Sequence, residues 1–466
     1  MNKKIITYSL VAVYLFVFLT IVTVIFDGAV VNVFIAEPLY GASALLFLFT
    51  FLLVLWIARK STAIPPSAAL FMFFLAGPIF GPPGLRVFEK LFGDLSNVNI
   101  ALAFPLFVWA LGMATLMVGI LVAHFIFKGP KRNRLVLWDE QRASLLLWGI
   151  MALAAIFTVF VLFRLGYVPI LHSNIDAVRG SFHKIVGEYP LKFSRLWLVA
   201  VPLAVTFAAV KTNRKVYLVL TAICCLLLMI YGQRIYAFVA IATAVLLSLK
   251  MQKVRIRHLA TFGLGLVVLS LLYAEFRGGR SFKELSTSEL VVMNIFREWR
   301  EYTFVVNEVR ESGDFYGEQF FTGALLPILP KQVWAVVGVD KNKLMTEKSA
   351  VYVLGRQFGD ELGIRIGTIG EAYTSFGLFY GVCLQLFAFG LLFGWLEVAY
   401  LRLDKRDARL ALVCFGLALL LFLPIATLIA TLSTAVFFGF FLLMFHFAAT
   451  YKLQLAPSHR HTTGGL

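Results

Sequence analysis

Charge is scarce in this chain. Asp, Glu, Lys and Arg make up only 14% of the 466 residues, whereas hydrophobic residues make up 60% and the mean hydropathy is +0.87. Ordinary soluble domains are about 25% charged and about 45–50% apolar. The uncharged residues fall in long runs, and a membrane-spanning helix needs roughly 20 apolar residues. The composition excludes a soluble enzyme, a DNA-binding protein and a disulfide-rich secreted domain. The run lengths exclude an outer-membrane barrel of short alternating strands.

Cysteine and histidine are also too few and too scattered to build a site. All four cysteines lie inside apolar runs, so we expect no structural disulfide among them: Cys224, Cys225, Cys383 and Cys414. The seven histidines do not combine with Cys, Asp or Glu at metal-ligand spacing. No Walker loop, dinucleotide fingerprint or Gly-x-Ser-x-Gly elbow occurs. The sequence therefore predicts no cofactor and no metal.

Long apolar runs dominate what is present, and they predict an all-α polytopic membrane protein with about 12 transmembrane helices. The candidate spans lie near residues 5–26, 40–57, 66–80, 100–127, 144–163, 196–210, 216–231, 235–249, 259–274, 374–400, 410–425 and 428–449. The first run follows Lys3 and Lys4 and is too long for the core of a signal peptide, so we expect it to be a membrane helix.

The charge distribution gives these spans an orientation. If both termini are cytoplasmic, the inside segments hold just over half of the 42 Lys and Arg residues but only a few of the 25 acidic ones. Such a bias is typical of cytoplasmic loops. The net charge of +17 is then explained by anionic lipid head groups, and we expect no nucleic-acid partner.

The same orientation divides the chain into four parts. Residues 1–275 hold the first nine spans, with an outward loop at about 164–195, and residues 276–370 form a large outward loop. Residues 371–450 hold the last three spans, and residues 451–466 form a cytoplasmic tail. A long loop in a compact protein is usually functional, and both enlarged loops open on the same side.

Arginines gather on this outward side, at helix ends and in the two loops. The candidates are Arg164, Arg179, Arg234, Arg277, Arg280 and Arg356, and Arg195 stands at the start of the sixth span. Any one of them could simply reach the lipid head groups. Several could instead converge into one cationic site, because Arg binds phosphate bidentately and stays charged when partly desolvated. The natural ligand of such a site is a lipid-linked phosphate or diphosphate.

Glu371 begins the tenth span, in a stretch that runs from Gly370 to Gly377 and is followed by Gly381. A carboxylate at the head of a membrane helix is costly unless it is paired or functional. Two interpretations stay open: Glu371 caps the helix, or it is a catalytic base. The spacing of Gly377 and Gly381 favours close approach of another helix.

The large loop contains an amphipathic pattern over residues 289–310, with Trp299, Tyr302 and Val306 on its apolar face. We expect a helix that lies on the outer membrane surface or packs as a lid. The apolar run at residues 333–339 is too short to span, but it could dip into the interface.

The whole architecture resembles that of the Wzy-type polymerases, which join O-antigen or oligosaccharide repeat units in bacterial envelopes. The resemblance is carried by Gly370-Glu371-x-Tyr373-x-x-Phe376-Gly377, by the Arg-x10-Gly spacing of Arg356 and Gly367, and by Gly232-Gln233-Arg234. The chain departs from the family in its earlier loop, where no second Arg-x10-Gly occurs.

The resemblance implies a GT-C-like glycosyltransferase of the bacterial inner membrane, working at the periplasmic face on undecaprenyl-diphosphate-linked oligosaccharide. It also implies a chain-length-determining co-polymerase as a possible partner. Glu371 would be the base or position the acceptor, with Tyr373 assisting it. The arginines would hold the diphosphate without a metal.

Three alternatives remain. An O-antigen ligase-like transferase shares the topology, but residues 276–370 lack the loop histidine that is usual in ligases. A lipid-linked oligosaccharide flippase or other transporter would place charges at mid-membrane depth, whereas these spans carry few, with His124 and Glu397 near inner ends. A scaffolding protein would not need an arginine-lined outer face.

Overall fold

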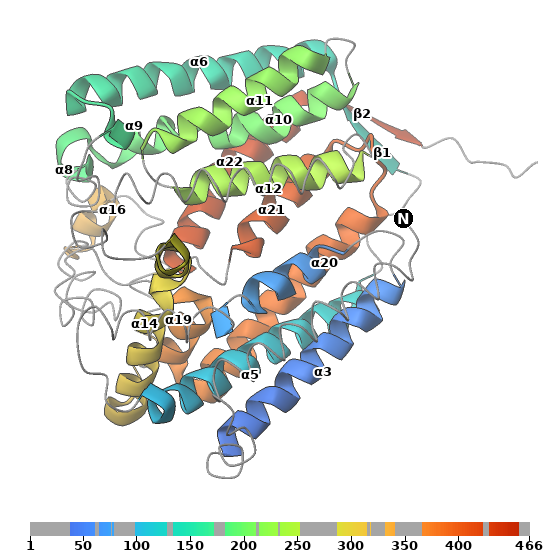
Figure 1. Ribbon diagram of the computed structural model, residues 1–466. Coiled ribbons are helices and arrows are strands. Elements are labelled where there is room, and N and C mark those ends of the chain that lie inside the picture. Colours follow the sequence, from blue (N-terminus) through green and yellow to red (C-terminus); the bar gives the residue numbers. More distant parts are fainter. Residues whose placement is uncertain are drawn as a thin grey trace, which may run out of the picture. The chain divides into compact units, whose positions relative to one another are not determined.

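The computed structural model describes most of the chain, and nearly all of the described residues are helical (Figure 1). They are residues 38–60, 65–75, 77–78, 98–127, 134–171, 182–210, 214–231, 234–251, 287–314, 317, 331–340, 366–422 and 428–455. The chain forms two compact units. The first contains Met1–Ile126, Thr261–Glu397 and Leu419–Val436, and the second contains Phe127–Ala260, Val398–Ala418 and Phe437–Leu466.

Five described helices are long and apolar enough to cross a membrane: Pro38–Arg59, Leu102–Ile126, Glu140–Leu165, Tyr189–Phe207 and Gly367–Arg402. Shorter apolar helices cover Pro66–Leu75, Val219–Met229, Ile235–Lys250, Arg409–Leu421 and Thr434–Ala449. The predicted all-α membrane class is thereby confirmed. The predicted spans near residues 5–26 and 259–274 lie outside the described residues, so the count of about 12 stays a prediction.

The helices of the first unit follow from these apolar runs. They are α3 (Pro38–Lys60), the helix Pro66–Leu75, α5 (Val98–Ile126), α14 (Thr287–Ser312), the short α16 (Lys331–Val336), α19 (Gly367–Phe376), the π-helical segment η4 (Gly377–Gln385) and most of α20 (Leu386–Arg402). Helix α14 confirms the predicted amphipathic helix: Trp299, Tyr302 and Val306 are buried. Figure 1 shows it beside α19 and the start of α5, which it contacts.

Glycines bring α5 and α20 into close contact. A methyl group on Gly119 would collide with the Phe387 carbonyl oxygen, and one on Gly390 would collide with the Leu116 carbonyl oxygen. One on Gly394 would lie 2.5 Å from Ala123 Cβ. Small residues let helix backbones approach in this way, and the resulting van der Waals contacts stabilise membrane helix pairs.

The second unit is also helical. It contains α6 (Glu140–Leu165), η1 (Pro169–Leu171), α8 (Phe182–Val186), α9 (Glu188–Phe193), α10 (Trp197–Val210), α11 (Arg214–Met229), α12 (Arg234–Lys250), most of α21 (Arg409–Leu421) and the later part of α22 (Leu428–Ala449). The candidate span that includes α10 starts at Tyr189, so the end of the predicted 164–195 loop is already helical.

Helix α6 shows why such sequences need a membrane. One face is buried at three- and four-residue spacing, for example at Leu147, Met151 and Ala154. The other face is apolar too, yet Leu145 is 74% and Phe163 83% exposed. A helix that exposes large apolar side chains along its length is solvated by lipid.

A small antiparallel ribbon adds to the helical fold. Strand β1 (Arg134–Trp138) pairs with β2 (Thr450–Leu455), with Val136 opposite Leu453. The ribbon is anchored in the second unit, where the Trp138 indole N–H donates to His446 Nδ1 at 3.2 Å and the Ala408 N–H donates to the Val136 carbonyl. It therefore joins a loop between helices to the segment that follows α22.

Candidate functional site

Glu371 is the central residue of the first unit's candidate site. It is 1% exposed and lies in the second turn of α19, whose first turn holds no acidic residue and whose N-cap position is Ile366. The helix dipole acts mainly within the first turn, so the structure argues against the capping interpretation. A buried carboxylate in an apolar helix is uncommon and is usually either paired or functional.

The helix that carries Glu371 is also internally braced. The hydroxyl groups of Thr374 and Ser375 donate to the Glu371 backbone carbonyl at 3.0 and 2.7 Å. Both side chains are buried, and back-bonding of this kind satisfies them inside the helix. The bracing fixes the backbone on which the carboxylate stands.

An aromatic wall packs behind α19. The Trp109 ring lies 5.0 Å from each of the Trp299 and Tyr302 rings, centroid to centroid. The Tyr302 hydroxyl donates to the Pro105 carbonyl at 2.8 Å, and the Trp109 indole N–H donates to the Phe74 carbonyl at 2.9 Å. Burial raises the pKa of Tyr302 well above its usual value, so the phenol stays protonated as a donor.

Tyr373 and Arg310 lie at the edge of this site. The Phe104 ring stands edge-on to the Tyr373 ring at 5.7 Å, and the Arg310 guanidinium carbon lies 4.6 Å from the centre of the Phe104 ring. Arg310 and Asp314 both interact electrostatically with the Tyr373 phenol. Arg310 itself is exposed, so a cation is available to a ligand next to the helix that carries Glu371.

Gly377 ends the regular α-helical geometry of α19. Its φ is +67°, a conformation that glycine adopts without strain, and a Cβ there would lie 2.9 Å from Asp314 Oδ2. Beyond the break, a methyl group on Gly381 would collide with the Ala372 carbonyl. The predicted close approach at Gly381 is thus made by the preceding helix of the same chain. π-Helical segments such as η4 are frequent at functional sites.

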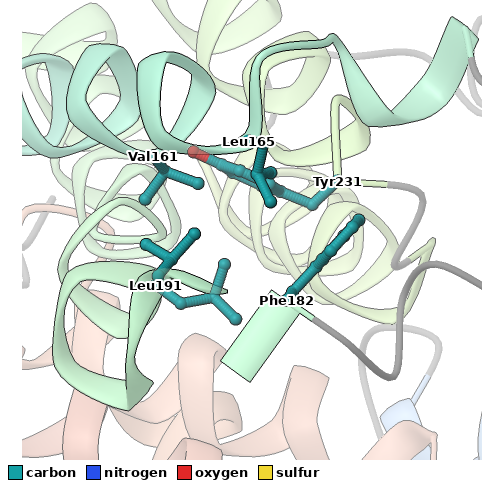
Figure 2. Packing of buried hydrophobic residues seen from close by; sticks show 6 residues of the cluster. Val161, Leu165, Phe182, Leu191 and Tyr231 are labelled. Carbon is teal, nitrogen blue, oxygen red and sulfur yellow. The ribbon is translucent and has the colours of Figure 1, made fainter. Parts of the chain in front are cut away.

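A second polar cluster lies in the other unit, around Arg195. This side chain is 4% exposed, and its Nη1 atom donates to the Tyr236 hydroxyl at 3.3 Å. The guanidinium carbon lies 4.7 Å from the centre of the Tyr236 ring and 5.9 Å from that of Tyr231. Figure 2 shows Tyr231 packed with Val161, Leu165, Phe182 and Leu191, so a hydrophobic cluster holds this tyrosine in place.

The predicted site residues are thus only partly placed. Glu371 and Tyr373 share one helix of the first unit. In the second unit, Arg164 is exposed near the end of α6, and Arg234 is the first residue of α12, its side chain not described. Four predicted arginines lie outside the described residues: Arg179, Arg277, Arg280 and Arg356. Their convergence stays a prediction.

Two arginines in these clusters were not assigned to the site from the sequence, although Arg195 was named among the outward arginines. Arg195 precedes a charge-free run, which is the pattern of a residue that reaches out to head groups, and only its burial distinguishes it. Arg310 stands on the polar side of an amphipathic helix, where an exposed charge is the ordinary expectation. Among the described residues, no three His, Cys, Asp or Glu side chains form a metal-binding group, and metal independence stays a prediction.

Comparison with known proteins gives the chain its family. A family model described as O-antigen polysaccharide polymerase Wzy matches residues 8–454 of the 466. No curated protein and no solved structure matches. The family model covers nearly the whole chain, and it confirms the resemblance predicted from the sequence. The chain therefore belongs to the O-antigen polysaccharide polymerase Wzy family, as a multi-pass protein of the bacterial inner membrane and a glycosyltransferase-type polymerase that acts on lipid-linked repeat units.

Proposed function

We propose that the protein polymerises undecaprenyl-diphosphate-linked oligosaccharide repeat units at the periplasmic face of the membrane. The observation that carries the proposal is Glu371, a carboxylate 1% exposed in the second turn of α19. It is too far along the helix to serve as a cap, and a base that acts on a sugar hydroxyl needs one carboxylate within hydrogen-bond reach.

The reaction exchanges one bond to the anomeric carbon for another. The growing glycan, attached to undecaprenyl diphosphate, is the donor, and a new lipid-linked repeat unit is the acceptor. An acceptor hydroxyl attacks the donor's anomeric carbon, and the bond from that carbon to the diphosphate oxygen breaks. Glu371 takes the hydroxyl proton and later returns it to water. Undecaprenyl diphosphate leaves with the electron pair of the broken bond.

Negative charge develops on the leaving diphosphate, and we assign its stabilisation to arginines. Arg234, Arg277, Arg280 and Arg356 are the main candidates, with Arg164 and Arg179 in support. Guanidinium groups aimed at a developing anion lower the barrier electrostatically, and several of them suffice without a metal. Tyr373 assists Glu371, and the exposed Arg310, which interacts electrostatically with Tyr373, is a further cation in this part of the first unit.

We also propose that the protein has a GT-C-like fold of about 12 membrane helices, with both termini in the cytoplasm. The charge bias of the sequence supports the orientation. The five long apolar helices support the polytopic arrangement. A chain-length-determining co-polymerase is the proposed protein partner.

Purified protein incubated with a lipid-linked repeat unit from its own strain tests the activity. The wild type is expected to give a ladder of lengthening lipid-linked glycans, which Glu371→Gln and Arg277→Ala abolish. Glu311→Gln is the matched control, because Glu311 is exposed at the end of α14, and it is expected to keep the ladder.

Other products would contradict the polymerase. Glycan transferred only when lipid A core is added would indicate a ligase, and substrate crossing liposomes without any product would indicate a transporter. Loss of turnover in EDTA, restored by added Mg²⁺, would refute the metal-free mechanism.

A further inference from the structure

Arg195 is held rigidly at the start of α10. Its backbone N–H donates to the Lys192 carbonyl at 3.1 Å, and its carbonyl accepts from the Leu198 N–H at 2.9 Å. The residues on either side are also bonded: the Ser194 hydroxyl donates to the Leu191 carbonyl, and the Trp197 indole N–H donates to the Thr158 hydroxyl at 3.0 Å. These bonds fix the backbone from which the Arg195 side chain extends.

The guanidinium is buried with its donors incompletely used. Only Nη1 has a hydrogen-bond partner, the Tyr236 hydroxyl, whereas Nε and Nη2 find none among the residues that the structure describes. No carboxylate in the described part of the chain pairs with it. A buried cation with unused donors is unfavourable, so its retention needs a compensating partner. The Tyr236 and Tyr231 rings supply only part of that compensation.

The guanidinium contacts the first turn of a long helix through one tyrosine. Tyr236, which Nη1 contacts, is the third residue of α12 (Arg234–Lys250). The first N–H groups of a helix are not used inside it, and the positive end of its dipole favours anions. The first turn of α12 contains no acidic residue that would satisfy this preference. Tyr236 therefore links two features that each favour an anion, an arginine with unused donors and a helix start without an acidic residue.

We propose that Arg195 and the first turn of α12 form a binding site for a phosphate-type oxyanion, in which Nε and Nη2 of Arg195 donate to the ligand and the Tyr236 hydroxyl positions the guanidinium. The site rests on the proposed function for its expected occupant, the diphosphate of the lipid-linked substrate. A phospholipid head group offers the same chemistry, so the test includes both sources.

The test measures binding without turnover, by thermal unfolding of the full-length protein in detergent with three probes: undecaprenyl diphosphate, inorganic diphosphate and phosphatidylglycerol. Wild type is expected to be stabilised by the two diphosphates. Arg195→Gln is expected to bind them about 10-fold or more weakly, since it loses charge-assisted bonds. Arg406→Gln, at an exposed arginine, is the matched control and is expected to bind like the wild type.

Two further variants keep the inference falsifiable if Arg195→Gln does not fold. Arg195→Lys retains the charge but loses the fork of donors, and Tyr236→Phe retains the ring but loses the hydroxyl. Each is expected to stay monodisperse and to bind diphosphate several-fold more weakly. Unchanged diphosphate binding in the folded variants would overturn the site.

The remaining outcomes separate this inference from the proposed function. Stabilisation by phosphatidylglycerol equal to that by undecaprenyl diphosphate, lost in Arg195→Gln, would support the oxyanion site but overturn the substrate as its occupant. A glycan ladder that needs Glu371, together with normal diphosphate binding by Arg195→Gln, would overturn the site and leave the polymerase standing. Diphosphate binding that depends on Arg195, without any glycan ladder, would support the site and overturn the polymerase.

Discussion

At the scale of single residues, Gly370 shows how tightly the helix that carries Glu371 fits its neighbours. A Cβ at this position would lie 2.8 Å from Ile366 Cβ and 3.1 Å from Tyr302 Cδ2. Tyr302 cannot retreat easily, because its hydroxyl is bonded to the Pro105 carbonyl and its ring is packed against Trp109. The glycine therefore lets α19 lie directly against the aromatic wall.

Gly370→Ala is expected to lower the free energy of unfolding by about 1–3 kcal/mol, as overpacking does, and to slow polymerisation through displacement of Glu371. Thermal unfolding in detergent and the ladder assay measure the two effects. Gly149→Ala is the control, because no atom lies within 4 Å of a Cβ there, and a neutral or slightly stabilising effect is expected. Equal behaviour of the two variants would contradict the tight fit.

The sequence identified Glu371 but could not decide its role. Its role as a cap depends on where α19 begins, which the sequence does not mark, because the N-cap position is Ile366 and makes no side-chain cap bond. Arg195 posed the opposite difficulty. An arginine before an apolar run reads the same in sequence whether it reaches the head groups or is buried, and its contacts with Tyr231 and Tyr236 connect residues distant in the chain.

At the scale of elements, a buried network ties three segments of the first unit. Glu397 on α20 is fully buried, and its Oε2 lies 2.9 Å from His124 Nε2 on α5. Its Oε1 accepts the Ser67 N–H at 2.8 Å, which satisfies a free donor at the start of the helix Pro66–Leu75. Glu397 thus caps one helix and pairs with His124 on another, so these two residues near the inner ends of the predicted spans hold helices together.

Replacing Glu397 separates these two roles. Glu397→Gln keeps an acceptor for Ser67 but weakens the bond to His124, whereas Glu397→Leu removes both. We expect Glu397→Leu to lower the free energy of unfolding by about 2–4 kcal/mol and Glu397→Gln to lower it by less. Denaturation of the detergent-purified variants would show the order, and equal stability of the two would contradict the capping role.

The seam between α5 and α20 gives a second prediction at this scale. Gly390→Ala would set a methyl group against the Leu116 backbone, which cannot rotate away, so the helices must separate. A loss of about 1–3 kcal/mol is expected. Gly439→Ala is the control, because a Cβ at this position on α22 would have open space around it, and it should unfold at the wild-type temperature. An equal loss of stability in both variants would contradict tight packing between α5 and α20.

Most elements could be predicted because each follows from one charge-free run, as α3 and α6 do. The break between α19 and η4 could not. The immediate neighbours of Gly377, Phe376 and Leu378, are apolar, and an uncharged run of this kind fits an uninterrupted span equally well. At the break, the Asp314 carboxylate lies beside Gly377 and the Gly317 N–H donates to the Ser375 carbonyl. Both contacts come from the segment that follows α14, which is distant in the sequence.

At the scale of the whole molecule, the orientation proposed from charge bias assigns opposite sides to two exposed residues. Glu311, on α14 in the large outward loop, should face the periplasm. Arg406, between α20 and α21, should face the cytoplasm. In a background without the four native cysteines, a membrane-impermeant maleimide should label Glu311→Cys in spheroplasts. It should label Arg406→Cys only after permeabilisation. The reverse pattern would invert the topology.

The ribbon of β1 and β2 adds a rule of parity. Because these strands are hydrogen-bonded, residues 134–138 and 450–455 lie on the same side of the membrane. A chain that leaves one side and returns to it crosses an even number of times, whatever the individual helices do. The eight spans predicted between the strands obey this rule. Any revision of the topology between Trp138 and Thr450 must therefore add or remove crossings in pairs.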